Sequence, residues 1–123
     1  MKNKRKILIV EDDLSNLELF SDIINMAGYE CIHASNGENA IEIAKREKPD
    51  LILLDIQLPG LDGMAVKNFL KSSDETRDIK VVALTAYAMK GDREMFLNEG
   101  FDGYISKPIK MKEFLQTIQD YIS

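Results

Sequence analysis

Carboxylates directly follow two apolar runs of this sequence. Asp55 ends the run Leu51–Leu54, and Glu11, Asp12 and Asp13 follow the run Ile7–Val10. If both runs are strands of one sheet, these side chains share an acidic pocket at its edge. Two carboxylates about 4 Å apart repel each other by roughly 4 kcal/mol at an effective dielectric constant near 20. A divalent cation relieves this repulsion, and carboxylates with water suit magnesium.

Two further polar residues belong to this pattern. Thr85 ends another apolar run and supplies a hydroxyl donor, while Lys107 supplies a compact, mobile positive charge for an anion. An acidic pocket with these two groups predicts a phosphoryl group carried on a carboxylate. Singly, each residue also has a structural interpretation: Asp55 as a turn former, Thr85 as a helix cap and Lys107 as a surface residue. Asp13 is interpreted as the start of a helix rather than as a ligand.

Apolar runs alternate with segments of helical period along the whole chain. Nearly continuous Ile, Leu and Val are typical of parallel strands that are covered on both faces. The predicted strands are Lys6–Glu11, Tyr29–Ala34, Leu51–Asp55, Lys80–Thr85 and Gly103–Ser106. The predicted helices are Leu14–Ala27, Gly37–Glu47, Gly63–Ser73, Tyr87–Glu99 and Lys110–Ile122.

This alternation predicts an α/β fold in three layers. Right-handed crossovers favour a flavodoxin-like (βα)5 sandwich, whose parallel five-stranded sheet has the order 2-1-3-4-5. The functional site is then expected at the switch point between the first and third strands. Neighbouring strands lie about 4.8 Å apart, so polar residues at their carboxyl ends meet in one pocket.

Composition narrows the classes of protein. The chain has 123 residues, which fits a single domain, and a net charge of -5, which argues against nucleic-acid binding. Cys31 is the only cysteine, so no internal disulfide is possible, and it is expected to be a small buried strand residue. His33 is the only histidine and is expected on a strand surface. With no apolar stretch of membrane length, we expect a cytoplasmic protein.

Four segments together resemble the receiver domain of bacterial two-component response regulators. They occur in the family's order and spacing, and the resemblance spans the chain as one domain, residues 1–123. The segments are Ile7–Asp13 (ILIVEDD), Pro49–Gly63 (PDLILLDIQLPGLDG), Val82–Tyr87 (VALTAY) and Tyr104–Ile109 (YISKPI).

The resemblance implies that Asp55 is the phosphoacceptor. Its carboxylate would take a phosphoryl group from a phosphohistidine of a histidine kinase or histidine phosphotransfer protein and become 4-aspartylphosphate. Asp55 would hold Mg2+ together with Asp12, the main-chain carbonyl of Gln57 and Glu11, the last through water.

The remaining motif residues are implied to respond to the phosphoryl group. Thr85 would hydrogen-bond it and Lys107 would pair with it, after a cis Lys107-Pro108 peptide bond. Tyr104 matches the switch aromatic of the family, although ordinary strand packing is the alternative. Downstream proteins would bind the surface formed by the fourth helix, fifth strand and fifth helix.

Two local features lead to separate hypotheses. Gly91 lies inside the fourth predicted helix, where glycine costs about 1 kcal/mol relative to alanine, so that first turn is expected to be mobile. Tyr87 and Gln57, each two residues after a site residue, are expected to overhang the phosphoryl site. A ring at Tyr87 would obstruct an attacking water and prolong the life of the acyl phosphate.

Several alternatives remain open from the sequence. A phosphatase of the haloacid dehalogenase type also uses a strand-end Asp, but it has a second Asp where this chain has Gln57. A flavodoxin-like electron carrier needs a phosphate loop after the first strand, where Glu11, Asp12 and Asp13 would repel the flavin phosphate. Within the receivers, the chain is similar to single-domain regulators of the cell-division type. It could also be part of a hybrid kinase, although Met1 favours an independent product.

Overall fold

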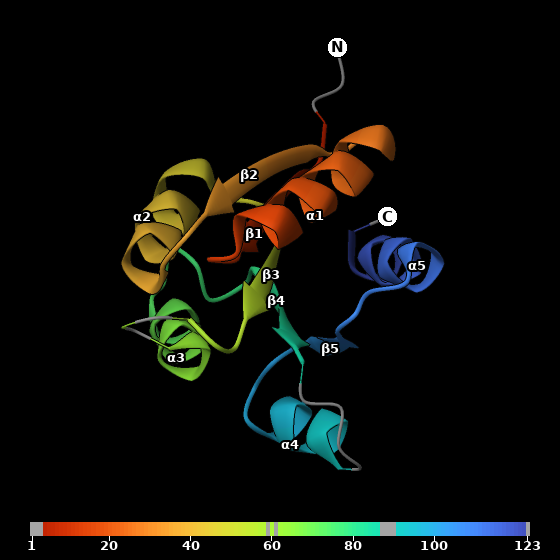
Figure 1. Ribbon diagram of the computed structural model, residues 1–123. Coiled ribbons are helices and arrows are strands. Elements are labelled where there is room, and N and C mark those ends of the chain that lie inside the picture. Colours follow the sequence, from red (N-terminus) through yellow and green to blue (C-terminus); the bar gives the residue numbers. More distant parts are fainter. Residues whose placement is uncertain (1–3, 59, 61, 87–90, 123) are drawn as a thin grey trace.

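The computed structural model describes residues 4–58, 60, 62–86 and 91–122, in which strands and helices alternate (Figure 1). The strands are β1 (Lys6–Val10), β2 (Glu30–Ala34), β3 (Leu51–Asp55), β4 (Lys80–Thr85) and β5 (Gly103–Ser106). The helices are α1 (Leu14–Met26), α2 (Gly37–Glu47), α3 (Gly63–Ser72), α4 (Asp92–Asn98) and α5 (Met111–Ile122).

The strands form one parallel sheet of order β2-β1-β3-β4-β5, which confirms the predicted flavodoxin-like topology. Ile7 of β1 pairs with Cys31 of β2 and Leu51 of β3, and Leu84 of β4 pairs with Asp55. This register brings the carboxyl ends of β1, β3 and β4 to the same edge. Within the described residues, no helix has the length and apolar character needed to cross a membrane.

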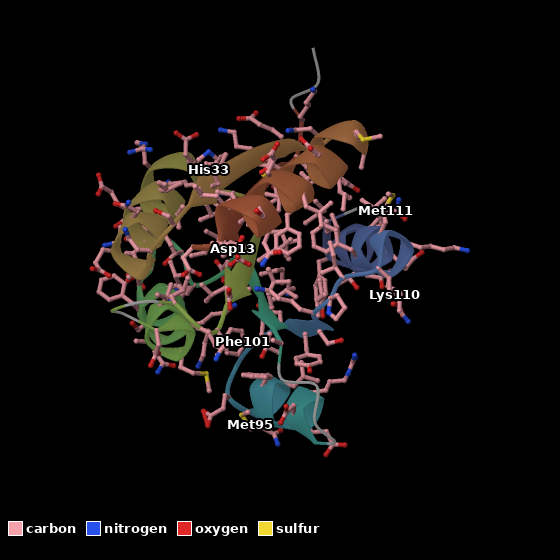
Figure 2. The ribbon with its side chains drawn as sticks, viewed as in Figure 1. Asp13, His33, Met95, Phe101, Lys110 and Met111 are labelled. Carbon is pink, nitrogen blue, oxygen red and sulfur yellow. The ribbon has the colours of Figure 1, made fainter. Side chains whose placement is uncertain are left out.

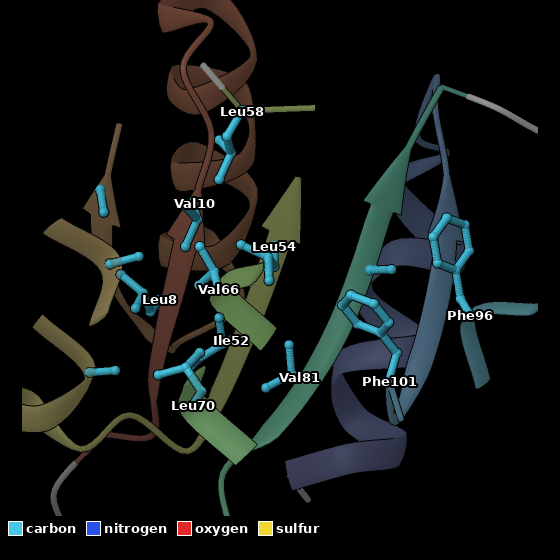
Figure 3. Close-up of a cluster of buried hydrophobic side chains, with 14 residues drawn as sticks. Leu8, Val10, Ile52, Leu54, Leu58, Val66, Leu70, Val81, Phe96 and Phe101 are labelled. Carbon is cyan, nitrogen blue, oxygen red and sulfur yellow. The ribbon is translucent and has the colours of Figure 1, made fainter. Parts of the chain in front are cut away.

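The central strands are buried on both faces because each face carries its own layer of helices. Alternate residues of β1 point in opposite directions: Ile7 and Ile9 pack with α1 and α5, whereas Leu8 and Val10 pack with α2 and α3. All four are fully buried. The hydrophobic cluster that contains Leu8 and Val10 also includes Phe96 and Phe101, which lie beside β4 and β5 (Figure 3). Continuous apolar runs therefore reflect burial on two faces.

Most element boundaries agree with the sequence predictions to within one residue. Helix caps explain why: the side chain of Asp13 accepts hydrogen bonds from the backbone of Ser15 and Asn16, and that of Asn36 accepts one from Asn39. Asp13 is thus the N-cap of α1, as expected. Figure 2 shows it at the start of this helix.

The prediction for the fourth helix was wrong about Gly91. Instead of lying inside the helix, Gly91 precedes it as the N-cap, with φ of 93°. A left-handed residue cannot continue a right-handed helix, so α4 begins at Asp92. The start predicted at Tyr87 falls at residues 87–90, outside the described part of the chain, as does the expected position of the Tyr87 ring.

The only histidine and the only cysteine of the chain both lie on β2. His33 is exposed on β2, as predicted (Figure 2). Cys31 is partly buried against the α1 and α5 side of the core, and its thiol lies 3.4 Å from the Ser21 hydroxyl. Burial raises the pKa of the Cys31 thiol above its ordinary value, which keeps it in the less reactive protonated form.

Candidate functional site

The strand ends are tied together by backbone hydrogen bonds just beyond the sheet ladder. The amide of Ile56 donates to the Leu84 carbonyl at 3.0 Å, which fixes the turn after β3 against β4. The amide of Lys107 donates to the Thr85 carbonyl at 2.7 Å, which fixes the end of β5 in the same way. The residues after three strands therefore have defined positions around one pocket.

A lysine bridges the two buried carboxylates of this pocket. Lys107 Nζ lies 2.7 Å from Glu11 Oε1 and 3.0 Å from Asp55 Oδ2. Glu11 is 1% exposed and Asp55 is 5% exposed, so water screens these charges little. Ion pairs of this kind offset the cost of burying charge only when their hydrogen bonds are good. One ammonium contacting both carboxylates meets that condition.

Burial and neighbouring charges shift the pKa values of both Glu11 and Lys107. Burial raises the pKa of Glu11, as do its hydrogen bond to Asp55 and the charge of that residue, and Lys107 only partly opposes the rise. Burial alone would lower the pKa of Lys107, but its hydrogen bonds to Glu11 and Asp55 outweigh burial and raise it above the ordinary value. Lys107 therefore stays charged at neutral pH, and on acidification Glu11 takes up a proton at a higher pH than an ordinary glutamate does.

The acidic residues are arranged so that they could hold one divalent cation. Ligand oxygens of Glu11, Asp12 and Asp55 all lie within 4.8 Å of one another. Asp12 is exposed, which leaves one side open to water, while the other two are buried. Magnesium prefers carboxylate oxygens from one or two residues and keeps several waters. Direct binding by two of these carboxylates, with waters on the exposed side at Asp12, therefore fits Mg2+.

The turn after β3 orients Asp55 from the opposite side. Asp55 Oδ1 accepts a hydrogen bond from the Gln57 amide at 2.9 Å, which leaves Oδ2 directed at Lys107. The amide of Gly63 in turn donates to the Ile56 carbonyl at 3.2 Å. A Cβ at Gly63 would lie 2.7 Å from Ile56 Cα and 2.8 Å from the Asp55 carbonyl oxygen. Glycine is needed here because the start of α3 touches the backbone of the site.

The other residues singled out from the sequence lie around the pocket or next to it. Thr85 is completely buried at the end of β4. The Lys107-Pro108 peptide bond is cis. Tyr104 is partly buried on β5, and its ring stacks on Phe96 of α4 at a centroid distance of 5.5 Å. The contact between Gly63 and the backbone was missed by sequence reasoning, although a glycine directly after the helix-capping Asp62 is its signal.

Comparison with known proteins places this site in a family. The family model of the response regulator receiver domain matches residues 7–119 of this chain. The polar-differentiation response regulator DivK of Brucella anthropi is 48% identical over 118 residues, and that of Brucella ovis is 46% identical. Each alignment covers 96% of both chains.

Two solved structures have the same architecture. The receiver domain of a sensor histidine kinase from Pseudomonas aeruginosa has a TM-score of 0.89 and 33% identity, covers 98% of both chains and has a magnesium ion coordinated in its active site cleft. The BeF3-activated N-terminal receiver domain of RstA from Klebsiella pneumoniae has a TM-score of 0.87 and 30% identity. It covers 98% of that chain and 96% of this one.

Together with the parallel fold and the acidic, lysine-bridged edge of its sheet, these comparisons define a phosphoryl-accepting signalling domain. The chain belongs to the response regulator receiver domain family. It is therefore a phosphoacceptor of two-component signalling with a histidine kinase as its partner, and its acidic pocket is a magnesium site. The phosphatase and electron-carrier alternatives are replaced by this assignment.

Replacing Gly63 with alanine should impair both the site and the fold. The added Cβ must push the backbone of Asp55 and Ile56 away, which misaligns the metal ligands. We expect the Mg2+ affinity, measured by calorimetry, to fall about tenfold. The free energy of unfolding should fall by roughly 1–3 kcal/mol. Met64→Ala, in the same helical turn, is the control: it loses partly buried packing but adds nothing beside the site. Equal Mg2+ affinities in the two variants would contradict the steric role of Gly63.

Mg2+ binding should weaken as the pH falls. This weakening should begin at a higher pH than it would if Glu11 had the pKa of an ordinary glutamate. The raised pKa of Glu11 means that it binds a proton above its usual pKa of about 4.3, and the pocket then loses one negative charge. Calorimetric titrations from neutral to acidic pH should show this decline. In Glu11→Gln the upper part of the pH profile should be flat, with weaker binding throughout. An unchanged profile in this variant would assign the titration to another group.

Proposed function

We propose that Asp55 accepts the phosphoryl group and that Glu11, Asp12, Thr85 and Lys107 serve this reaction. The observation that carries the proposal is the contact of Lys107 Nζ with both buried carboxylates. Asp55 Oδ2 is the oxygen in contact with the lysine, whereas Oδ1 is engaged by the Gln57 amide. A nucleophile held in this way needs little further orientation.

The proposed transfer is an in-line displacement at phosphorus. An Asp55 carboxylate oxygen forms the new P–O bond, the P–N bond of the phosphohistidine breaks, and the imidazole leaves with the electron pair of that bond. Asp12, Asp55 and the main-chain carbonyl of Gln57 would hold Mg2+, with Glu11 acting through water. Bound magnesium would neutralise charge that develops on the phosphoryl oxygens.

Lys107 and Thr85 have different parts in this proposal. The lysine exchanges its contact with Asp55 for one with a phosphoryl oxygen, so that its charge stays paired after transfer. Thr85, at the end of β4, donates its hydroxyl to the phosphoryl group. Because the Lys107 amide is bonded to the Thr85 carbonyl, a shift of Thr85 is transmitted to the end of β5.

We further propose that the surface of α4, β5 and α5 is the output surface. It contains a pocket of about 280 Å3, whose walls include Arg93 of α4, Tyr104 of β5 and Phe114 of α5. Tyr104 would act as the switch, since its ring lies beside this pocket and on Phe96. Protein partners would therefore sense the phosphorylation state through the position of this ring.

Similarity to the DivK regulators supports the proposal that this chain is a single-domain regulator that acts by binding other proteins. In this proposal it exchanges phosphate with a histidine kinase or a histidine phosphotransfer protein. The related receiver from Pseudomonas aeruginosa is part of a sensor histidine kinase. The chemistry proposed for Asp55 is the same in either setting. A cytoplasmic location stays a prediction.

Acetyl phosphate with Mg2+ should add one phosphoryl group to the protein. Intact mass spectrometry should detect this gain in the wild type and lose it in Asp55→Asn. Asp13→Asn is a matched control, because it removes a carboxylate from the same edge while asparagine can still cap α1. Labelling of Asp55→Asn, or loss of labelling in Asp13→Asn, would contradict the assignment of Asp55.

Phosphorylation should move the ring of Tyr104 only when Thr85 has its hydroxyl. We expect the Tyr104 ring resonances in the NMR spectrum to shift on adding acetyl phosphate and Mg2+. Thr85→Ala should still gain the phosphoryl group by mass but show little of this shift, because the hydroxyl that follows the phosphoryl oxygens is gone. A full shift in Thr85→Ala would show that Tyr104 responds by another route.

A further inference from the structure

Lys67 of α3 is a buried lysine that lies away from the phosphoacceptor pocket. The residue is 5% exposed, and its ammonium donates hydrogen bonds to Asn68 Oδ1 at 2.5 Å and to the main-chain carbonyl of Glu99. It also lies 5.6 Å from the centre of the Phe101 ring. No carboxylate of the described residues is within ion-pair distance of it. Lysines are rarely buried without a partner, so this position calls for a specific one.

The partner of Lys67 is the C-terminal end of α4. This end has the hydrogen bonds of a Schellman motif: the amide of Gly100, at φ of 103°, donates to the Leu97 carbonyl, and that of Phe101 donates to the Phe96 carbonyl, both at 3.1 Å. The rings of Phe96 and Phe101 meet edge to face with centroids 5.7 Å apart. Lys67 engages the carbonyl of Glu99, the C-cap residue.

Charge explains why α4 needs a cation from another helix. The last turn of α4 has no basic residue, so the partial negative charge at this end has no counterpart within the helix. The ammonium of Lys67 supplies it, and the ring of Phe101 adds a cation–π contact. The C-terminal end of α4 is therefore held by α3 as well as by its own turn.

The N-terminal end of α4 is built differently. Its N-cap is Gly91, which has no side chain with which to cap the helix. The helix has only seven residues, and it reaches Tyr104 through the stacked ring of Phe96. One end is thus anchored to α3, while the other begins at a left-handed glycine next to the output surface.

We propose that Lys67 is the anchor about which α4 reorients when the phosphorylation state of Asp55 changes. This inference rests on the proposed function of Asp55 for its trigger, but not for the anchor itself. Movement is confined to the N-terminal part of α4, residues 91–95, and residues 99–101 stay in place. The Phe96 ring, between the two parts, then transmits the tilt to Tyr104.

Amide hydrogen exchange followed by NMR tests the anchor in the unphosphorylated protein. Lys67→Met keeps the chain length and removes the charge, and we expect exchange at residues 99–101 to accelerate about tenfold. Lys71→Met is the matched control: Lys71 lies one turn further along α3, but it contacts Asp102 and the Ile79 carbonyl instead of α4. Equal acceleration at residues 99–101 in both variants would overturn the anchor.

The pivot itself is tested in the wild-type protein, so this experiment does not depend on whether any variant folds. After acetyl phosphate and Mg2+, exchange and chemical shifts should change at residues 92–95 and remain constant at residues 99–101. Changes of equal size in both segments would overturn the pivot. Intact mass reports separately whether Asp55 carries the phosphoryl group. Failure to label would therefore refute the trigger, while the comparison of Lys67→Met with Lys71→Met would still decide the anchor.

Discussion

The contact between Lys107 and the carboxylates of Glu11 and Asp55 is the interaction on which this structure depends. Two buried carboxylates at neighbouring strand ends repel each other, and the ammonium that touches both makes the arrangement stable. The lysine comes from beyond β5, two strands away from β3. The carboxyl ends of β3, β4 and β5 must therefore lie at the same edge of the sheet. A parallel sheet with buried faces on both sides meets this requirement, because its register is held by the packing of each residue.

The same crowding makes the pocket responsive. A group that brings its own negative charge changes which oxygens Lys107 can pair with, and a divalent cation changes how much repulsion the carboxylates retain. The turn after β3 cannot relax freely, since the Gln57 amide holds Asp55 on one side and Gly63 touches the backbone of Ile56 on the other. In the function proposed for Asp55, we therefore expect a change in charge to be passed to β4 and β5 instead of being absorbed in the turn.

Beyond the pocket, the described contacts form two groups that are linked along β5. The Lys107 amide is bonded to the Thr85 carbonyl, Tyr104 of β5 stacks on Phe96, and Phe96 meets Phe101, over which Lys67 lies. These contacts combine an end of α4 that Lys67 contacts with an end that begins at a left-handed glycine, and the proposed reorientation of α4 rests on this asymmetry.

The sequence by itself determined the alternation of elements, the topology and the residues of the acidic pocket. Apolar runs of strand length, followed by polar residues, carry this information locally, and a parallel sheet leaves the polar residues no other place than a common edge. Only the tertiary structure decided that α4 begins after Gly91, that Gly63 touches the site and that Lys67 is buried. These features depend on backbone conformation and on contacts between segments far apart in the chain. A glycine or lysine looks the same in the sequence whether it faces solvent or another helix.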